Sequence, residues 1–324
     1  LEIYEIQHVT ADIKQGRPPE YATIASQYDP ATLDPASLRE LVHLYAESDR
    51  PQDAMRVGQV FVDRFAATHP EWTPRVQRLM ALASLKTGAA GVDQAIANFQ
   101  ASITDATPAA EKLDSFAQLI ALLGIEKQQP QQVPALLKQV EQTTRNSRTT
   151  AEVKAAYRRA INSAGDVALW NNQTQQARNY YRRVEAMRGQ FIPSQVRAAR
   201  VGAFPQAIRS YLAEANYGAA LQVVDEWEDK FATEKVKGQT FFWRGAILSA
   251  RQQYRDASRY LERSVTLAVG AAFETEARWR LAVSWQQLGR EKESRLELAR
   301  LVATGLNDTF TEQARQRLKE TSRK

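Results

Sequence analysis

The clearest pattern in the chain is FFWRGAILSARQQYRDASRYL, residues 241–261. Its apolar and small residues recur three and four positions apart, which is the spacing of one face of an α-helix, and a short polar break at 251–253 separates two such faces. Gly245 in the first helix and Ala257 in the second are small, so we expect the two helices to touch there, with Leu248 filling the space beside Gly245. The stretch predicts a helix-turn-helix hairpin.

This hairpin pattern repeats along the chain. A small residue recurs every 37 to 43 residues, a few positions into each second helix, and anchors seven copies: Ala54, Ala95, Ala135, Ala177, Ala220, Ala257 and Ser294. A fixed period of this length is typical of solenoids, and no alternating β-branched run bounded by Asn-Gly or Asp-Gly turns interrupts it. The sequence therefore predicts an all-α solenoid of about seven helix-turn-helix repeats.

The order of aromatic, small, large, turn and small positions resembles the tetratricopeptide repeat family. The match is best over residues 238–305, extends over 152–237, and is loosest over 35–140, where the spacing is longer. The resemblance implies a superhelical stack whose first helices line a concave groove. The DEWE run at 225–228 and the ARQRL run at 314–318 are similar to repeat proteins of bacterial envelope assemblies.

The quality of the repeats divides the chain into four expected parts. An N-terminal segment (1–34) precedes degenerate helical hairpins (35–150). The better tetratricopeptide-like repeats follow (151–305), and a capping helix with a basic tail (306–324) ends the chain.

In the tetratricopeptide repeat family, one stripe of residues along each first helix lines the groove. The corresponding positions in this chain hold side chains that the hairpin cores do not need. Phe242 and Trp279 are the strongest candidates, and we expect them to face one cleft. The expected rim comprises Arg209, Gln239 and Gln286. The same stripe farther upstream comprises Arg39, His43 and Ala46 in the first copy, and Arg159, Asn162, Asp166 and Trp170 in the fourth. Aromatic and arginine side chains dominate binding hot spots, which favours a partner-binding groove. The alternative is that both aromatic residues pack against adjacent repeats. The clamp with which family members hold C-terminal carboxylates is not reproduced.

Basic residues gather in the middle of the chain. Residues 151–210 contain ten Arg or Lys against three acidic residues, whereas the whole chain has a net charge of +6. Arg178, Arg182 and Arg183 form the densest group, which indicates a basic patch for an acidic partner or an anionic surface. The alternative is a solvated helix face. No sequence-reading motif accompanies the arginines, so nucleic acid is not an expected partner.

Composition and motifs argue against several classes of function. The chain has no Cys and three scattered His, which excludes thiolate metal sites and disulfides and argues against histidine metal sites. No glycine-rich phosphate loop or nucleophile elbow is present. We therefore expect no catalytic residues, no cofactor and no metal.

The sequence thus predicts a non-catalytic adaptor that holds a peptide segment or a partner subunit in a concave helical groove. The alternative is the helical arm of a larger envelope enzyme or sensor. The chain begins with Leu1 rather than Met. We interpret it as a fragment or as a chain whose upstream signal was removed, which favours the bacterial periplasm.

Overall fold

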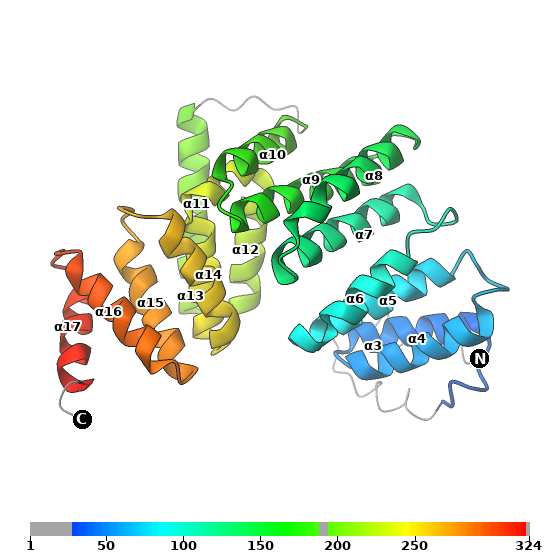
Figure 1. Cartoon of the computed structure of the whole chain (residues 1–324), viewed down its shortest axis with the longest axis horizontal. Coiled ribbons are helices and arrows are strands. Elements are labelled where there is room, and N and C mark those ends of the chain that lie inside the picture. Colours follow the sequence, from blue (N-terminus) through cyan, green and yellow to red (C-terminus); the bar gives the residue numbers. More distant parts are fainter. Residues whose placement is uncertain (1–27, 188–193, 322–324) are drawn as a thin grey trace. The chain divides into compact units, whose positions relative to one another are not determined.

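The computed structural model describes residues 28–187 and 194–321 (Figure 1). These residues form fifteen α-helices and no strand, in two compact units, Leu1–Asn171 and Asn172–Lys324. Unit 1 contains α3 (Pro35–Glu47), α4 (Pro51–Phe65), α5 (Thr73–Lys86), α6 (Val92–Ala101), α7 (Ala109–Ala121), α8 (Val133–Arg145) and α9 (Ala151–Trp170). Unit 2 contains α10 (Thr174–Ala186), α11 (Ser194–Ala213), α12 (Tyr217–Lys230), α13 (Gln239–Ala250), α14 (Tyr254–Leu267), α15 (Glu274–Gln287), α16 (Glu291–Ala303) and α17 (Thr309–Thr321). The predicted all-α helical-repeat fold is confirmed.

Within unit 1 the packing changes along the chain. Helices α3 to α6 each pack on the next, as in a regular stack of hairpins. Helix α7 packs most extensively on α9, and α8 contacts both. A π-helical turn (Leu122–Glu126) and a short 3-10 helix (Pro130–Gln132) lie between α7 and α8. The third hairpin is therefore irregular.

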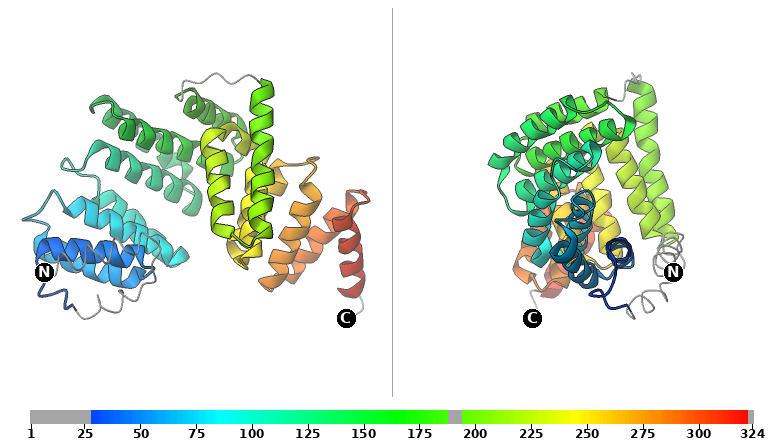
Figure 2. Two further views of the ribbon diagram at one scale, coloured as in Figure 1. Left: turned by 180° about the vertical axis from the view of Figure 1, so that it is seen from behind. Right: turned by 90° about the vertical axis from the view of Figure 1, so that its right-hand side faces the viewer.

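Unit 2 is more regular. Figures 1 and 2 show α11 to α17, coloured green through yellow to red, following one another in chain order. Each of these helices packs on the next, and the 3-10 helix η4 (Ala232–Lys237) joins α12 to α13 and packs on α10.

The expected division of the chain can be compared with these units in part. The boundary between the units, at 171/172, lies 21 residues after the boundary that repeat quality suggested at 150/151. Most of the expected N-terminal segment, residues 1–27, and the end of the expected basic tail, residues 322–324, lie outside the described residues.

A left-handed residue stands in the turn of each of the seven hairpins. Two of these residues are glycines, Gly88 and Gly289, and the others are Asp49, Gln128, Asn172, Ala215 and Gln252. In four turns the next N–H donates to the carbonyl five residues back, as from Gln253 to Leu248 at 2.9 Å and from Arg290 to Trp285 at 2.9 Å. This bond is typical of the Schellman end of a helix. The turns thus repeat even where no glycine marks them.

The small residues behave as expected in six of the seven hairpins. A Cβ on Gly245 would lie 2.6 Å from Leu261 Cγ, so α13 and α14 do touch where the sequence places the contact. Ala257 is fully buried, as are Ala54, Ala95, Ala177 and Ala220, and Ser294 is nearly so. Ala135 is exposed, and its predicted role as an anchor is wrong. Helix α8 buries Val133 and Val140 instead, because the irregular segment before it changes which face meets α7 and α9.

A buried ion cluster holds α12, η4 and α13 together. Arg244 Nη2 donates to Glu228 Oε2 at 2.9 Å and to Asp225 Oδ1 at 2.7 Å, and Lys235 Nζ lies 3.9 Å from the Glu228 carboxylate. Burial raises the pKa of Glu228, but the charges of Arg244 and Lys235 lower it more, so the pKa lies below its ordinary value. The carboxylate is therefore ionised and acts as a structural partner of both cations.

None of the helices that the structure describes has the length and hydropathy of a membrane span.

Candidate functional site

The predicted groove around Phe242 is wrong. The Phe242 side chain is 1% exposed, and its ring centroid lies 4.9 Å from that of Trp243 and 5.2 Å from that of Phe273. Helix α13 packs on α11, α12, α14 and α15, so the three consecutive aromatics 241–243 each find a covering helix. Phe242 points away from its own hairpin, packs against the next hairpin and does not line a cleft.

Trp279 belongs to a different cluster. It packs with Leu298, Leu301 and Ala314, and the guanidinium of Arg317 lies 5.1 Å from the centroid of its ring. Ala314 and Arg317 are on α17, so the last helix covers Trp279. Phe242 is in the larger core of unit 2 instead. The prediction that the two aromatics face one cleft is therefore wrong.

The three polar residues of the predicted rim lie on three helices. Arg209 on α11 is exposed, and its guanidinium lies 5.3 Å from the centroid of the Trp243 ring. Gln239 on α13 and Gln286 on α15 are half-buried. Because Phe242 is buried, these residues do not surround an apolar floor. They therefore do not form the predicted rim.

The basic patch lies on α10. Arg178, Arg182 and Arg183 are exposed, and the opposite face of the helix buries Ala177 and Tyr181. Within residues 28–187 and 194–321, no acidic oxygen lies within 4.0 Å of Arg178 or Arg182, and these two are four positions apart. The acidic residue of the helix, Glu185, is occupied: Arg197 donates to it at 3.1 Å. The patch is thus a basic helix face in unit 2.

A pocket of about 250 Å³ opens where three first helices of unit 1 meet. It is lined from α5 by Arg78 and Leu82, from α7 by Asp114, Ala117 and Gln118, and from α9 by Arg159, Asn162 and Ser163. We call it the first-helix pocket. Of the predicted stripe residues on α9, Arg159 and Asn162 line this pocket, whereas Asp166 and Trp170 do not.

Asp114 is the centre of the first-helix pocket. Its Oδ1 accepts from Arg159 Nε at 2.7 Å, and its Oδ2 accepts from Arg78 Nη2 at 3.3 Å. Arg78 Nη1 also lies 3.9 Å from the Glu111 carboxylate. Asp114 thus pairs with guanidiniums from two different helices. Each planar guanidinium has five N–H donors, so donors remain for a ligand.

The floor of the first-helix pocket has an apolar part. Leu82 is 37% exposed, and Ala117 also belongs to the lining. Leu82, Gln118 and Ser163 each stand four positions after Arg78, Asp114 and Arg159 on their helices. This shared spacing is the signal by which the α5 and α7 residues could have been found. These residues were not predicted, because the repeat pattern is too poor around Ala95 and Ala135 for a stripe to be aligned there.

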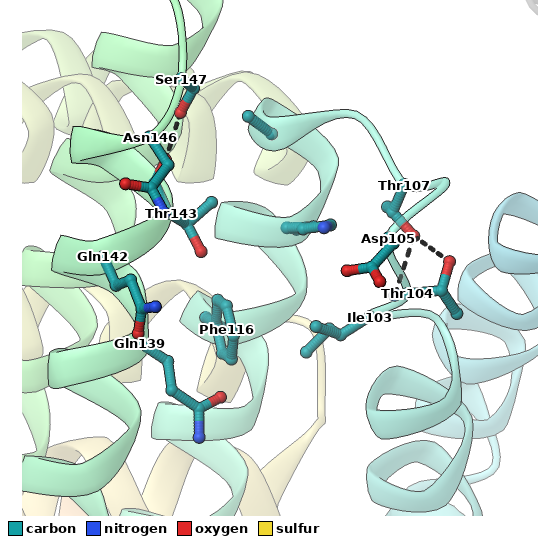
Figure 3. A pocket seen from close by; sticks show the side chains of 12 residues that line it. Ile103, Thr104, Asp105, Thr107, Phe116, Gln139, Gln142, Thr143, Asn146 and Ser147 are labelled. Carbon is teal, nitrogen blue, oxygen red and sulfur yellow. Dashed lines mark hydrogen bonds between the residues drawn. The ribbon is translucent and has the colours of Figure 1, made fainter.

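A second pocket, of about 370 Å³, lies on the other side of α7 (Figure 3). The last two turns of α8 and the two residues after them form one wall, the loop before α7 forms the other, and Phe116 lies between them. We call it the amide pocket. It is lined by Ile103, Thr104, Asp105, Thr107, Ala109, Lys112, Phe116, Gln139, Gln142, Thr143, Asn146 and Ser147. It shares no residue with the first-helix pocket.

Metal-binding chemistry has no candidate among the described residues, because no three His, Asp or Glu side chains come together there in a way that could hold an ion.

Comparison with known proteins adds structural likenesses. No protein-family model and no curated protein matches the chain. Among solved structures, it is similar to the apo form of the quorum sensor NprR from B. thuringiensis, with 15% identity and a TM-score of 0.43 over 93% of this chain and 86% of that one. It is also similar to the C-terminal part of a TPR repeat-containing protein from Cytophaga hutchinsonii, with 12% identity and a TM-score of 0.40 over 95% and 98% of the two chains.

A third likeness is to the APC/C hetero-tetramer Cut9–Hcn1, with 13% identity and a TM-score of 0.39 over 97% of this chain. The chain spans about half, 48%, of the length of that chain.

Proposed function

We propose that the protein is a non-catalytic scaffold that binds an extended segment of a partner protein at the first-helix pocket. The observation that carries the proposal is the meeting of three successive first helices, α5, α7 and α9, around Asp114. A peptide laid across these helices would contact several repeats at once, which is how helical-repeat surfaces bind.

The lining suits a peptide better than a small apolar molecule. Leu82 and Ala117 offer a place for one apolar side chain, and Gln118 carries an amide that can both donate to and accept from a peptide backbone. The guanidiniums of Arg78 and Arg159 are held by Asp114 before any ligand arrives, so little side-chain order has to be gained on binding.

The same residues support a non-catalytic role. The lining of the first-helix pocket contains no His, Cys or Lys, and its one hydroxyl, that of Ser163, has no general base among the lining residues. The only carboxylate in the lining, that of Asp114, is engaged by two arginines. The pocket can therefore bind and orient a ligand but has no activated nucleophile.

A random peptide library displayed on phage and selected against the full chain tests this function. We expect selected peptides to bind a Leu82→Lys variant at least tenfold more weakly, because lysine fills the apolar place and adds a charge beside two arginines. The matched control is Leu296→Lys, since Leu296 is 54% exposed on α16 in unit 2. Failure to select any peptide, or equal loss in both variants, would contradict the proposal.

A second binding function is favoured by the exposed arginines on α10. We propose that the basic patch of Arg178, Arg182 and Arg183 attracts an acidic segment of a partner. Exposed charges act over roughly 8 Å at physiological ionic strength, so this attraction should weaken as salt is added. Reversing the three arginines to Glu should slow association more than it speeds dissociation. If neither added salt nor the substitution of the three arginines by Glu changes the rate of association, the patch is only a solvated helix face.

A further inference from the structure

The amide pocket carries an inference that is independent of the proposed function, because the two pockets share no residue and lie on nearly opposite faces of α7. Residues 112 and 116 line the amide pocket, whereas 114 and 118 line the first-helix pocket. A shift of two residues turns about 200° around a helix axis, which separates the two sets.

One wall of the amide pocket is a row of neutral side chains with unused hydrogen-bonding groups. Gln139, Gln142, Thr143 and Asn146 stand at positions i, i+3, i+4 and i+7, so they share one face, and Figure 3 shows them on the same side of the pocket. In the described parts of the chain, the amides of Gln139, Gln142 and Asn146 bond to no other side chain. Each such amide has both a donor and an acceptor to offer a ligand.

The opposite wall is held in place by its own hydrogen bonds. The Thr107 hydroxyl donates to the Ser102 carbonyl at 2.7 Å and accepts from the Thr104 N–H at 3.1 Å. The Ser102 hydroxyl lies 2.9 Å from that of Ser115 on α7, and Ser102 is buried. These bonds fix the loop to α7. The wall is therefore formed before any ligand binds.

Two opposite charges complete the lining. Asp105 is on the loop and Lys112 is in the first turns of α7. Neither forms an ion pair within residues 28–187 and 194–321, although a basic and an acidic group line the same pocket. The formal charge of the lining is zero, but both signs are present and open to a ligand.

We infer that the amide pocket binds a small zwitterion, a free amino acid or short peptide, with its ammonium on Asp105, its carboxylate on Lys112 and its amide groups on the α8 side chains. An uncharged ligand such as a sugar would displace water from both charges and return no countercharge. A simple anion or cation would pair with one of the two charged side chains and leave the other without a countercharge. Only a ligand with both charges satisfies the whole lining.

The volume agrees with this class. At about 370 Å³ the pocket is at the lower end of the roughly 300–1,000 Å³ of ordinary ligand sites. Phe116 is almost completely buried, so it serves as an apolar floor and offers no free ring face for a sugar to stack on.

Titration of the full chain with triglycine, followed by calorimetry, tests the inference. We expect saturable binding of triglycine, and at least tenfold weaker binding of triglycine capped as an N-acetyl amide, because the capped peptide has lost both charges. Lys112→Met and Asp105→Asn should each weaken triglycine binding at least fivefold. Circular dichroism should show unchanged helix content in both variants.

Two controls keep the inference falsifiable. Gln142→Ala should weaken binding, whereas Gln131→Ala, which removes an exposed amide outside the pocket, should leave binding unchanged. Leu82→Lys should also leave triglycine binding unchanged, which separates this inference from the function proposed for the first-helix pocket. Absence of triglycine binding, equal affinity for the capped peptide, or binding of maltose in place of triglycine would overturn it.

Discussion

The hairpins α13 to α16 in unit 2 and the helices α6 to α9 in unit 1 follow the same repeat pattern with different results. In unit 2, Gly245 lets α14 approach α13 closely, and the aromatics 241–243 are all buried. In unit 1, a π-helical turn and a 3-10 helix within residues 122–132 separate α7 from α8, and both pockets described above adjoin α7. The regular hairpins of unit 2 thus pack closely at the α13–α14 seam, whereas the irregular hairpin of unit 1 contributes a helix to both pockets.

This difference assigns separate roles to the two regions. The closed repeats of unit 2 use their best side chains, including Phe242 and Trp279, for packing. In unit 1, Leu82, Gln142 and Asn146 are exposed and line the two pockets. We therefore expect substitutions in unit 2 seams to act on stability, and substitutions around α7 to act on binding.

The largest expected effect on stability is at the ion cluster of unit 2. Glu228→Gln should lower the free energy of unfolding by about 3 kcal/mol or more, because it removes the charge that compensates the buried Arg244 and Lys235. The matched control is Glu226→Gln, whose exposed i,i+4 pair with Lys230 should contribute less than about 0.5 kcal/mol. Urea unfolding at neutral pH measures both, and equal effects would show that the cluster is not buried as described.

Substitution of the small anchor residue by tryptophan should lower the stability of one region and not of the other. Ala257→Trp should overpack the closed α13–α14 seam and lower stability by roughly 1–3 kcal/mol. Ala135→Trp, at the corresponding sequence position in unit 1, should change stability by less than about 0.5 kcal/mol because Ala135 is exposed. Thermal unfolding of the two variants compares them directly. Similar losses would mean that α8 is packed as regularly as α14.

The smallest expected effect concerns the left-handed turn glycines, which both units contain. Gly88 in unit 1 and Gly289 in unit 2 both have positive φ, 75° and 73°, and a Cβ added to either would meet nothing within 4 Å. Gly88→Ala and Gly289→Ala should therefore each cost about 1 kcal/mol, from backbone strain alone. Urea midpoints of the two variants should shift equally. A loss at Gly289 only would place the difference between the regions in the turns rather than in the helix spacing.

The fold was predictable because it depends on local spacing. The contact between Gly245 and Leu261 and the burial of Ala257 follow from residue size and helical period within one hairpin. The prediction that Ala135 is a buried anchor is wrong because a π-helical turn and a 3-10 helix before α8 change the face that α8 packs against α7 and α9. Such changes in register come from how several helices pack, and the spacing of small residues does not record them.

The site was less predictable because it depends on contacts between hairpins. Phe242 looks free within its own hairpin and is covered by the next one, near Phe273. Arg159 was found on its helix stripe, but Arg78 and Asp114 become its neighbours only when α5, α7 and α9 meet. The amide pocket needs the loop before α7, whose position no helical period gives.

Hydrogen exchange on the full chain with a selected peptide tests the central claim most directly, namely that binding occurs on the first helices of unit 1. The claim predicts slower amide exchange on peptide binding in residues 73–86, 109–121 and 151–170, which cover α5, α7 and α9. Exchange in residues 239–303, which cover α13 to α16, should stay the same. Protection confined to residues 239–303, with none in α5, α7 or α9, would contradict the claim.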